Sequence, residues 1–206
     1  MIVRSGAMPK SPKIDEHQVL AFLASLFATD LHAKRVLSLA HATIGVIQSA
    51  SLAIHAIGIG MAEARGLNPK HAIKQVDRML NNRGIDVWAL FAVWVPFVLG
   101  ARKDILVALD WTDHDQDDQT TIAINLVTKH GRATQLVWMT VEKSKLLNHR
   151  NEFEDRVILR LGEVLPAGVR VTVLADRGFG DPEVLQVAGR GRLRLLHPIS
   201  RNHHSN

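Results

Sequence analysis

Two aspartates stand where the chain could hold metal ions. Asp110 follows the apolar run Leu-Val-Ala-Leu, and Asp176 follows the run Thr-Val-Leu-Ala. A carboxylate directly after a buried strand is costly unless its charge is used, and two on neighbouring strands repel each other unless cations lie between them. Carboxylates suit Mg²⁺ or Mn²⁺, and two such ions about 4 Å apart serve phosphoryl transfer. The pair predicts a two-ion site, although either aspartate alone could simply cap a turn.

Basic side chains accompany both acids. Lys143 and Lys145 follow the third predicted strand, with Arg150 just beyond, and Arg177 adjoins Asp176. These cations could contact phosphates near the acids. A solvated basic turn explains the two lysines equally well, and Arg177 could pair with a nearby acid.

A second group of cations lies in the first half of the chain, on a predicted helix that contains Lys70, Lys74 and Arg78 and precedes Arg83. The spacing of four places several of them on one helical face, where they could contact DNA phosphates without distinguishing sequences. The alternative is an ordinary solvated face.

The composition agrees with a polyanionic partner. The 206 residues carry 25 Lys and Arg against 20 Asp and Glu, and there is no cysteine. The basic excess suits a polyanion such as DNA, and the lack of cysteine excludes disulfides and thiolate metal sites, which fits a reducing cytoplasm. The apolar stretch from Val87 to Ala101 is shorter than the roughly 18 residues of a membrane span and contains Pro96, so we expect a core helix and no membrane partner.

The elements that position these residues are predicted from periodicity. After a flexible arm at residues 1–13, residues 14–102 show helical spacing, with Asn68 and Pro69 as a typical helix start. Residues 103–188 then predict a strand-strand-strand-helix-strand-helix order. The strands are expected at 105–110, 120–128, 134–141 and 169–175, the first helix after a cap at Asn148, and the second from Pro182. This is an α/β fold.

Three segments resemble one family. The runs Leu-Asp-Trp-Thr, Thr-Lys-His-Gly-Arg-Ala-Thr and Ala-Asp-Arg-Gly-Phe-Gly-Asp are similar to the DDE transposases of bacterial insertion sequences, in the branch with a Tyr-Arg-Glu-Lys signature. The resemblance spans roughly Ile14 to Glu183. It implies that residues 103–188 are part of an RNase H-like catalytic domain, in which the first and fourth strands are adjacent and parallel.

The resemblance also implies an activity. Asp110 and Asp176 would be the first two of three catalytic acids, at a site where Mg²⁺-dependent cleavage at the transposon end is followed by strand transfer. The helical region would bind the DNA of the terminal inverted repeats. Target DNA and a second copy of the chain, in a synaptic homodimer, are the further partners that the family implies. The resemblance also implies a bacterial cytoplasmic protein associated with the nucleoid.

The chain departs from that family at the third acid. Glu183 is the one glutamate after Asp176, and no Tyr-Arg-Glu-Lys spacing surrounds it. We therefore expect a truncated, inactive transposase. A non-enzymatic DNA-binding or dimerising fragment that inhibits the intact enzyme is the alternative, and a small nuclease that uses Glu183 ranks last.

The tail at residues 189–206 is basic and rich in histidine, and it lacks the aromatic strand of the family. Codons for residues 192–206 can be chosen that encode such a strand when they are read one nucleotide later. A frameshift is thus the hypothesis for this tail, and the gene's nucleotide sequence tests it. Loss of the fifth strand would leave an unpaired sheet edge.

Overall fold

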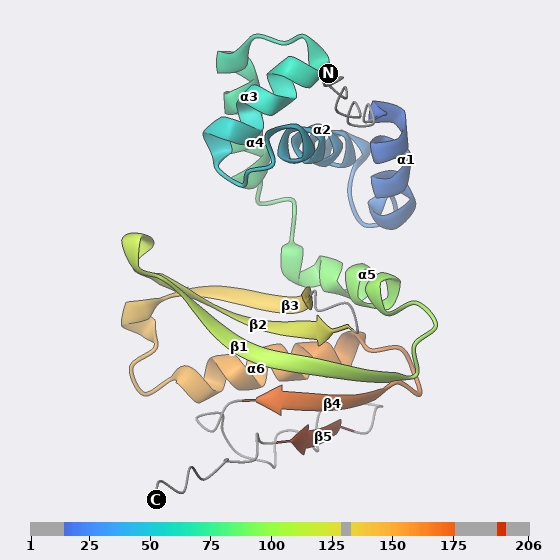
Figure 1. The fold of residues 1–206 in the computed structure, drawn as a ribbon, viewed down its shortest axis with the longest axis vertical. Coiled ribbons are helices and arrows are strands. Elements are labelled where there is room, and N and C mark those ends of the chain that lie inside the picture. The colour runs from blue at the N-terminus through green and yellow to red at the C-terminus, as the bar shows by residue number, and fades with distance from the viewer. Residues whose placement is uncertain (1–14, 129–132, 176–192, 197–206) are drawn as a thin grey trace, which may run out of the picture. The chain divides into compact units, whose positions relative to one another are not determined.

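The computed structural model of the protein describes residues 15–128, 133–175 and 193–196 (Figure 1). The chain divides into two compact units, Met1–Asp86 and Val87–Asn206. The division lies before the predicted boundary at residue 103, because the helix that begins at Val87 packs with the sheet. Each unit is described separately below.

The helical unit contains four helices: α1 (Glu16–Phe27), α2 (Ala33–Ser49), α3 (Ile54–Arg65) and α4 (Pro69–Leu80). The predicted start of α4 is confirmed, since the side chain of Asn68 accepts a hydrogen bond of 3.0 Å from the backbone N–H of Lys70 and Pro69 opens the helix. Gly66 ends α3 with a φ of 64°, a left-handed conformation that glycine adopts without strain.

Glycines allow three of these helices to approach closely. A methyl group on Gly45 of α2 would lie 2.4 Å from the carbonyl oxygen of Ile57 in α3, and one on Gly60 would lie 2.7 Å from the carbonyl oxygen of Gly45. Gly58 faces the backbone of Ile73 in α4 in the same way, at 2.6 Å from its Cα. Backbone therefore packs directly against backbone in this unit.

The second unit is a mixed sheet with two helices. Its elements are α5 (Val87–Leu99), β1 (Asp104–His114), β2 (Gln119–Val127), β3 (Ala133–Glu142), α6 (Arg150–Val164), β4 (Arg170–Ala175) and β5 (Leu193–Leu196), with short 3₁₀ turns at Asp115–Asp117 and Lys143–Lys145. The strand order is β3-β2-β1-β4-β5. β1 pairs antiparallel with β2, and β2 with β3, whereas β1 and β4 are parallel, as are β4 and β5. The predicted α/β class and the first four strands are confirmed.

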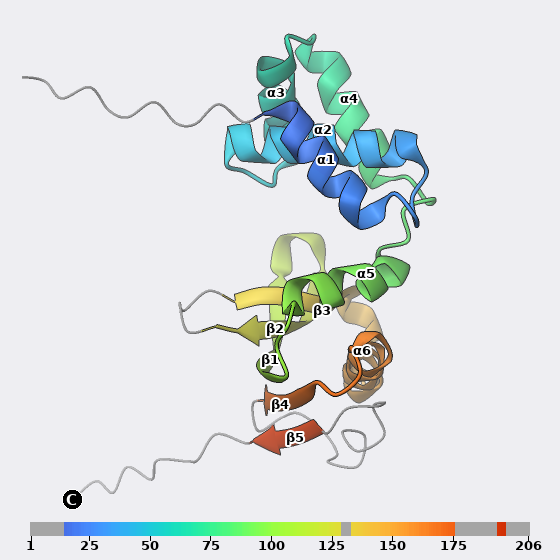
Figure 2. The ribbon, with the colours of Figure 1, turned by 90° about the vertical axis from the view of Figure 1, so that its right-hand side faces the viewer.

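One face of the sheet carries the core. Alternate residues of β1 point into it, where they meet α6, and Figure 2 shows α6 lying against one side of the sheet; the buried residues include Ile105, Val107, Leu109, Val157 and Leu161. α5 adds Phe91, Val95 and Leu99, each at most 1% exposed, so the predicted core helix is confirmed.

Among the described residues, no single helix is long and apolar enough to cross a membrane. α2 and α3 together meet the length and composition criteria but are bent by 97° at the break between them.

Three expectations need correction. The expectation that the sheet lacks a fifth strand is wrong, because Leu193–Leu196 forms β5, which pairs in parallel with β4 on the side away from β1. Asn148 does not cap α6, since it has a φ of 62° and His149 occupies the cap position. Asp110 does not end β1, which continues to His114 by pairing with β2. The helix predicted from Pro182 lies outside the described residues.

Candidate functional site

Asp110 lies in β1, one residue beyond the last described pair between β1 and β4. The parallel pairing of β1 with β4 runs from Asp104↔Arg170 to Leu109↔Ala175, one residue before Asp110. Beyond that point β1 pairs with β2 alone among the described residues. Because side chains alternate along a strand, Asp110 points away from the core face, and it is exposed.

The row of the sheet that contains Asp110 is otherwise apolar, and the next row on the same face is polar. Its register partners across the sheet are Ala123 in β2 and Trp138 in β3. The neighbouring row on the same face holds Thr121 and Thr140, whose hydroxyl oxygens lie 2.7 Å apart. Asp110 forms none of the ion pairs identified among the described residues, so its carboxylate is available to a ligand.

The second predicted acid cannot be placed beside the first. Asp176 follows Ala175, the last described residue of β4, and it lies outside the described residues, as do Arg177 and Glu183. In the described part of the chain, no group of three or more His, Asp or Glu side chains is arranged to hold a metal ion. The two-ion site therefore stays a prediction.

The ammonium group of Lys143 is paired with two carboxylates of its own unit. Its ammonium lies 3.5 Å from Asp113 and also pairs with Asp115, and these contacts, above all the hydrogen bond to Asp115, raise the pKa of Lys143. A hydrogen bond from Thr120 and the nearby cations lower the pKa of Asp113. Lys145 forms an exposed pair with Glu142 at 3.1 Å.

A second polar cluster lies on the core face, at the residue after Asp110. The indole N–H of Trp111 donates to Oε1 of Glu154 at 3.0 Å, and Nε of Arg150 lies 3.5 Å from the same oxygen. The guanidinium carbon of Arg150 sits 5.0 Å from the centroid of a Trp111 ring. Glu154 is not among the residues predicted from the sequence. Its spacing of four from Arg150 is a weak signal, and no sequence pattern connects either residue to Trp111.

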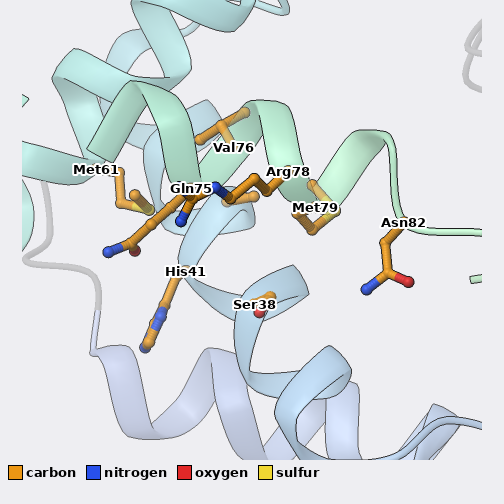
Figure 3. A pocket seen from close by; sticks show the side chains of 9 residues that line it. Ser38, His41, Met61, Gln75, Val76, Arg78, Met79 and Asn82 are labelled. Atoms are coloured by element: carbon orange, nitrogen blue, oxygen red, sulfur yellow. The ribbon is translucent and has the colours of Figure 1, made fainter. Parts of the chain in front are cut away.

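In the helical unit, the predicted stripe on α4 is exposed. None of the ion pairs identified among the described residues involves Lys70, Lys74 or Arg78. Arg78 also lines a pocket of about 220 Å³. Figure 3 shows Gln75, Arg78 and Met79 of α4 on one side of this pocket and Ser38 and His41 of α2 on the other.

His41 is a largely buried polar residue of that pocket, with a side chain that is 13% exposed. Its Nε2 is buried and lies 3.1 Å from Oε1 of Glu16. Nε of Arg65 donates to the same glutamate oxygen at 3.1 Å. Burial, followed by the nearby charge of Arg65, lowers the pKa of His41, although Glu16 opposes the change. The cluster links α1 to α2 and α3.

Comparison with known proteins finds no protein-family model, no curated protein and no solved structure that matches the chain.

Proposed function

We propose that the chain is a DDE transposase component, with an RNase H-like catalytic domain that acts on the phosphodiester bonds at transposon ends. One observation carries the proposal: β1 and β4 are adjacent and parallel, and the last described pair between them is Leu109↔Ala175. The next residues in sequence are Asp110 and Asp176, and consecutive Cα atoms are only about 3.8 Å apart. The strand order β3-β2-β1-β4-β5 supports the same domain type.

The carboxylates are the part of this site that would hold Mg²⁺ or Mn²⁺. Asp110 is exposed and contributes to none of the ion pairs identified among the described residues, which suits a hard cation. Bound ions would activate water and stabilise charge on the phosphate. Of the two predicted metal ligands, Asp110 is the one that lies among the described residues.

For the 206-residue chain itself we propose DNA binding without cleavage. The resemblance calls for three acids, and the sequence supplies matches to two of them. The exposed cations Lys74 and Arg78 on α4 favour DNA contact by the helical unit, because their charges are not neutralised by the acids of the described residues. Such a chain would compete with an intact transposase, or pair with it, as a non-enzymatic inhibitor.

Metal binding tests the paired acids. We expect Mn²⁺ titration, followed by electron paramagnetic resonance, to show weak binding by the wild-type chain. Asp110→Ala and Asp176→Ala should each weaken it by at least about tenfold, since even outer-shell partners of a metal cost that much when removed. Asp117→Ala, at an exposed acid of the 3₁₀ turn, is the matched control. Equal effects of all three variants would contradict a shared Asp110–Asp176 site.

Cleavage assays separate the candidate activities. DNA that carries the terminal repeats, identified by sequencing the flanking region, should be bound but not cut in Mg²⁺ or Mn²⁺. Strong cutting of these ends that Asp110→Ala abolishes would overturn the inactivity and support an active transposase. Cutting of any duplex, or of RNA–DNA hybrids, that depends on Glu183 would instead indicate a small nuclease.

A further inference from the structure

We propose that Arg150 is a pre-oriented phosphate-binding residue, which grips the DNA backbone beside the Asp110 site and is held in place by Trp111 and Glu154. The inference rests on the proposed function, because it names a DNA contact of that same unit. Arg150 lies over Trp111, and the side chains of Trp111 and Asp110 point to opposite faces of the sheet because the two residues are consecutive in β1. The phosphate that Arg150 binds is therefore one that flanks the reacting phosphate.

The first support is the environment of Glu154. Its residue exposure is 3%, so its carboxylate is almost entirely removed from water within the packed face of α6. A buried carboxylate is costly unless it is hydrogen-bonded and paired with a cation. Trp111 supplies the hydrogen bond and Arg150 supplies the charge. The cluster thus ties the first turns of α6 to β1 immediately after Asp110.

The second support is the way in which Arg150 is held. Its contact with Glu154 uses Nε, and the flat guanidinium lies over the Trp111 ring. The side chain is nevertheless 55% exposed, and no hydrogen bond identified among the described residues uses its terminal amino groups. A guanidinium fixed at one edge presents these groups as a fork that fits two phosphate oxygens.

Arg160, on the same helix, is an arginine whose guanidinium donors are all used within the sheet unit. It also lies over a tryptophan ring, with its guanidinium carbon 5.9 Å from the centroid of Trp88. All three of its nitrogens are used, however: two donate to the carbonyl oxygen of Trp88 and the third to Glu163. The side chain is only 16% exposed. Arg150 shares the aromatic contact but keeps its donors, as a binding residue requires.

The neighbouring lysine makes the assignment to Arg150 more specific. Lys143 lies between Asp113 and Asp115, so an incoming phosphate would have to displace two carboxylates. The hydrogen bond from Thr120 and the charge of Lys143 lower the pKa of Asp113 more than the charge of Arg150 does. Asp113 therefore interacts mainly with Thr120 and Lys143. Of Lys143 and Arg150, Arg150 is therefore the cation that a phosphate can reach without displacing two carboxylates.

The test is DNA binding by the full 206-residue chain, measured as fluorescence anisotropy of a short labelled DNA duplex between about 50 and 200 mM salt. Arg150→Ala should weaken binding by about tenfold and reduce the slope of log affinity against log salt by about one, as expected for one lost phosphate contact. Arg156→Ala, at an exposed arginine of the same helix, should change neither quantity appreciably.

A second variant separates orientation from charge. Arg150→Lys retains the charge but loses the planar fork and its stacking on Trp111, so the salt slope should persist while affinity falls several-fold. This variant also keeps the test decisive if Arg150→Ala unfolds, which the thermal melting curve of each protein will show. Binding by Arg150→Lys equal to that of the wild type would overturn the pre-oriented fork.

The outcomes distinguish this inference from the function on which it rests. If the wild-type chain binds DNA and Arg150→Ala behaves like Arg156→Ala, the role of Arg150 is overturned while DNA binding stands. If the wild-type chain shows no salt-dependent binding of the duplex, both the role of Arg150 and the proposed DNA-binding function are overturned.

Discussion

The helical unit packs by close backbone approach, whereas the sheet unit packs by burying large side chains. In the helical unit a methyl group on Gly45 would lie 2.4 Å from the carbonyl oxygen of Ile57. In the sheet unit the core is filled by side chains such as Phe91, Ile122 and Leu136, none more than 1% exposed. The difference implies that the sheet unit should be most sensitive to atoms removed from its core. The helical unit should be most sensitive to atoms added between helices.

The two units also use their charges differently. Around the sheet, Arg170 pairs with Asp104 at the start of the β1–β4 pairing, with a shortest contact of 2.5 Å, and Lys143 pairs with two acids. On α4, the ion pairs identified among the described residues leave Lys74 and Arg78 out. Arg170 and Lys143 of the sheet unit are therefore held by acids of that unit, whereas Lys74 and Arg78 of α4 form none of the identified pairs.

Removal of Phe91 should have the largest effect. Phe91→Ala leaves a cavity beside Trp138, whose ring centroid lies 4.7 Å away, and should lower the free energy of unfolding of the sheet unit by about 3–5 kcal/mol. Urea unfolding followed by tryptophan fluorescence measures it. Phe97→Ala, at a half-exposed phenylalanine of the same helix, is the control and should cost much less. Equal costs would mean that α5 does not contribute to the core as described.

An added methyl group should come next. Gly45→Ala forces α2 and α3 apart at backbone atoms that cannot rotate away, and should cost about 2–3 kcal/mol. Gly66→Ala, where no atom lies within 4 Å but φ is 64°, should cost only about 1 kcal/mol through backbone strain. Circular dichroism during urea unfolding compares the two. If Gly66→Ala proves the more harmful, close helix contact is not what limits the helical unit.

Loss of the α4 cap should be smaller still. Asn68→Ala removes the acceptor for the N–H of Lys70 and should cost about 1 kcal/mol, whereas Asn68→Ser retains a good cap and should be nearly neutral. The same unfolding experiment measures both variants. A neutral Asn68→Ala would show that packing of α4 makes its cap redundant.

Mild acid should produce the smallest effect, confined to the helical unit. The pKa of His41 is lowered from its ordinary value of 6.5, so the unfolded chain binds a proton more readily than the folded one. Stability is therefore fully present above pH 6.5 and falls as the pH drops through the lowered pKa of the folded state. Thermal melts at a series of pH values should show a fall in Tm that His41→Gln reduces. An unchanged pH dependence in that variant would exclude His41 as its source.

The sequence by itself determined the elements whose causes are local. Asn68 and Pro69 specify the start of α4, and apolar alternation specifies the β1 strand that carries Asp110. The predicted α/β class was correct for the same reason, because hydrophobic periodicity reports the face that each element buries. The resemblance supplied the expectation that the first and fourth strands are adjacent and parallel, which the register of β1 and β4 confirms.

Only the tertiary structure decided the features that depend on partners distant in sequence. β1 passes Asp110 because β2 offers backbone groups that continue the ladder, and Leu193–Leu196 becomes a strand because β4 offers a free edge. The buried Glu154 acquires its meaning from Trp111, 43 residues away along the chain. Such contacts arise from the packing of α6 on the sheet, and no local pattern of residue types encodes which side chains will meet there.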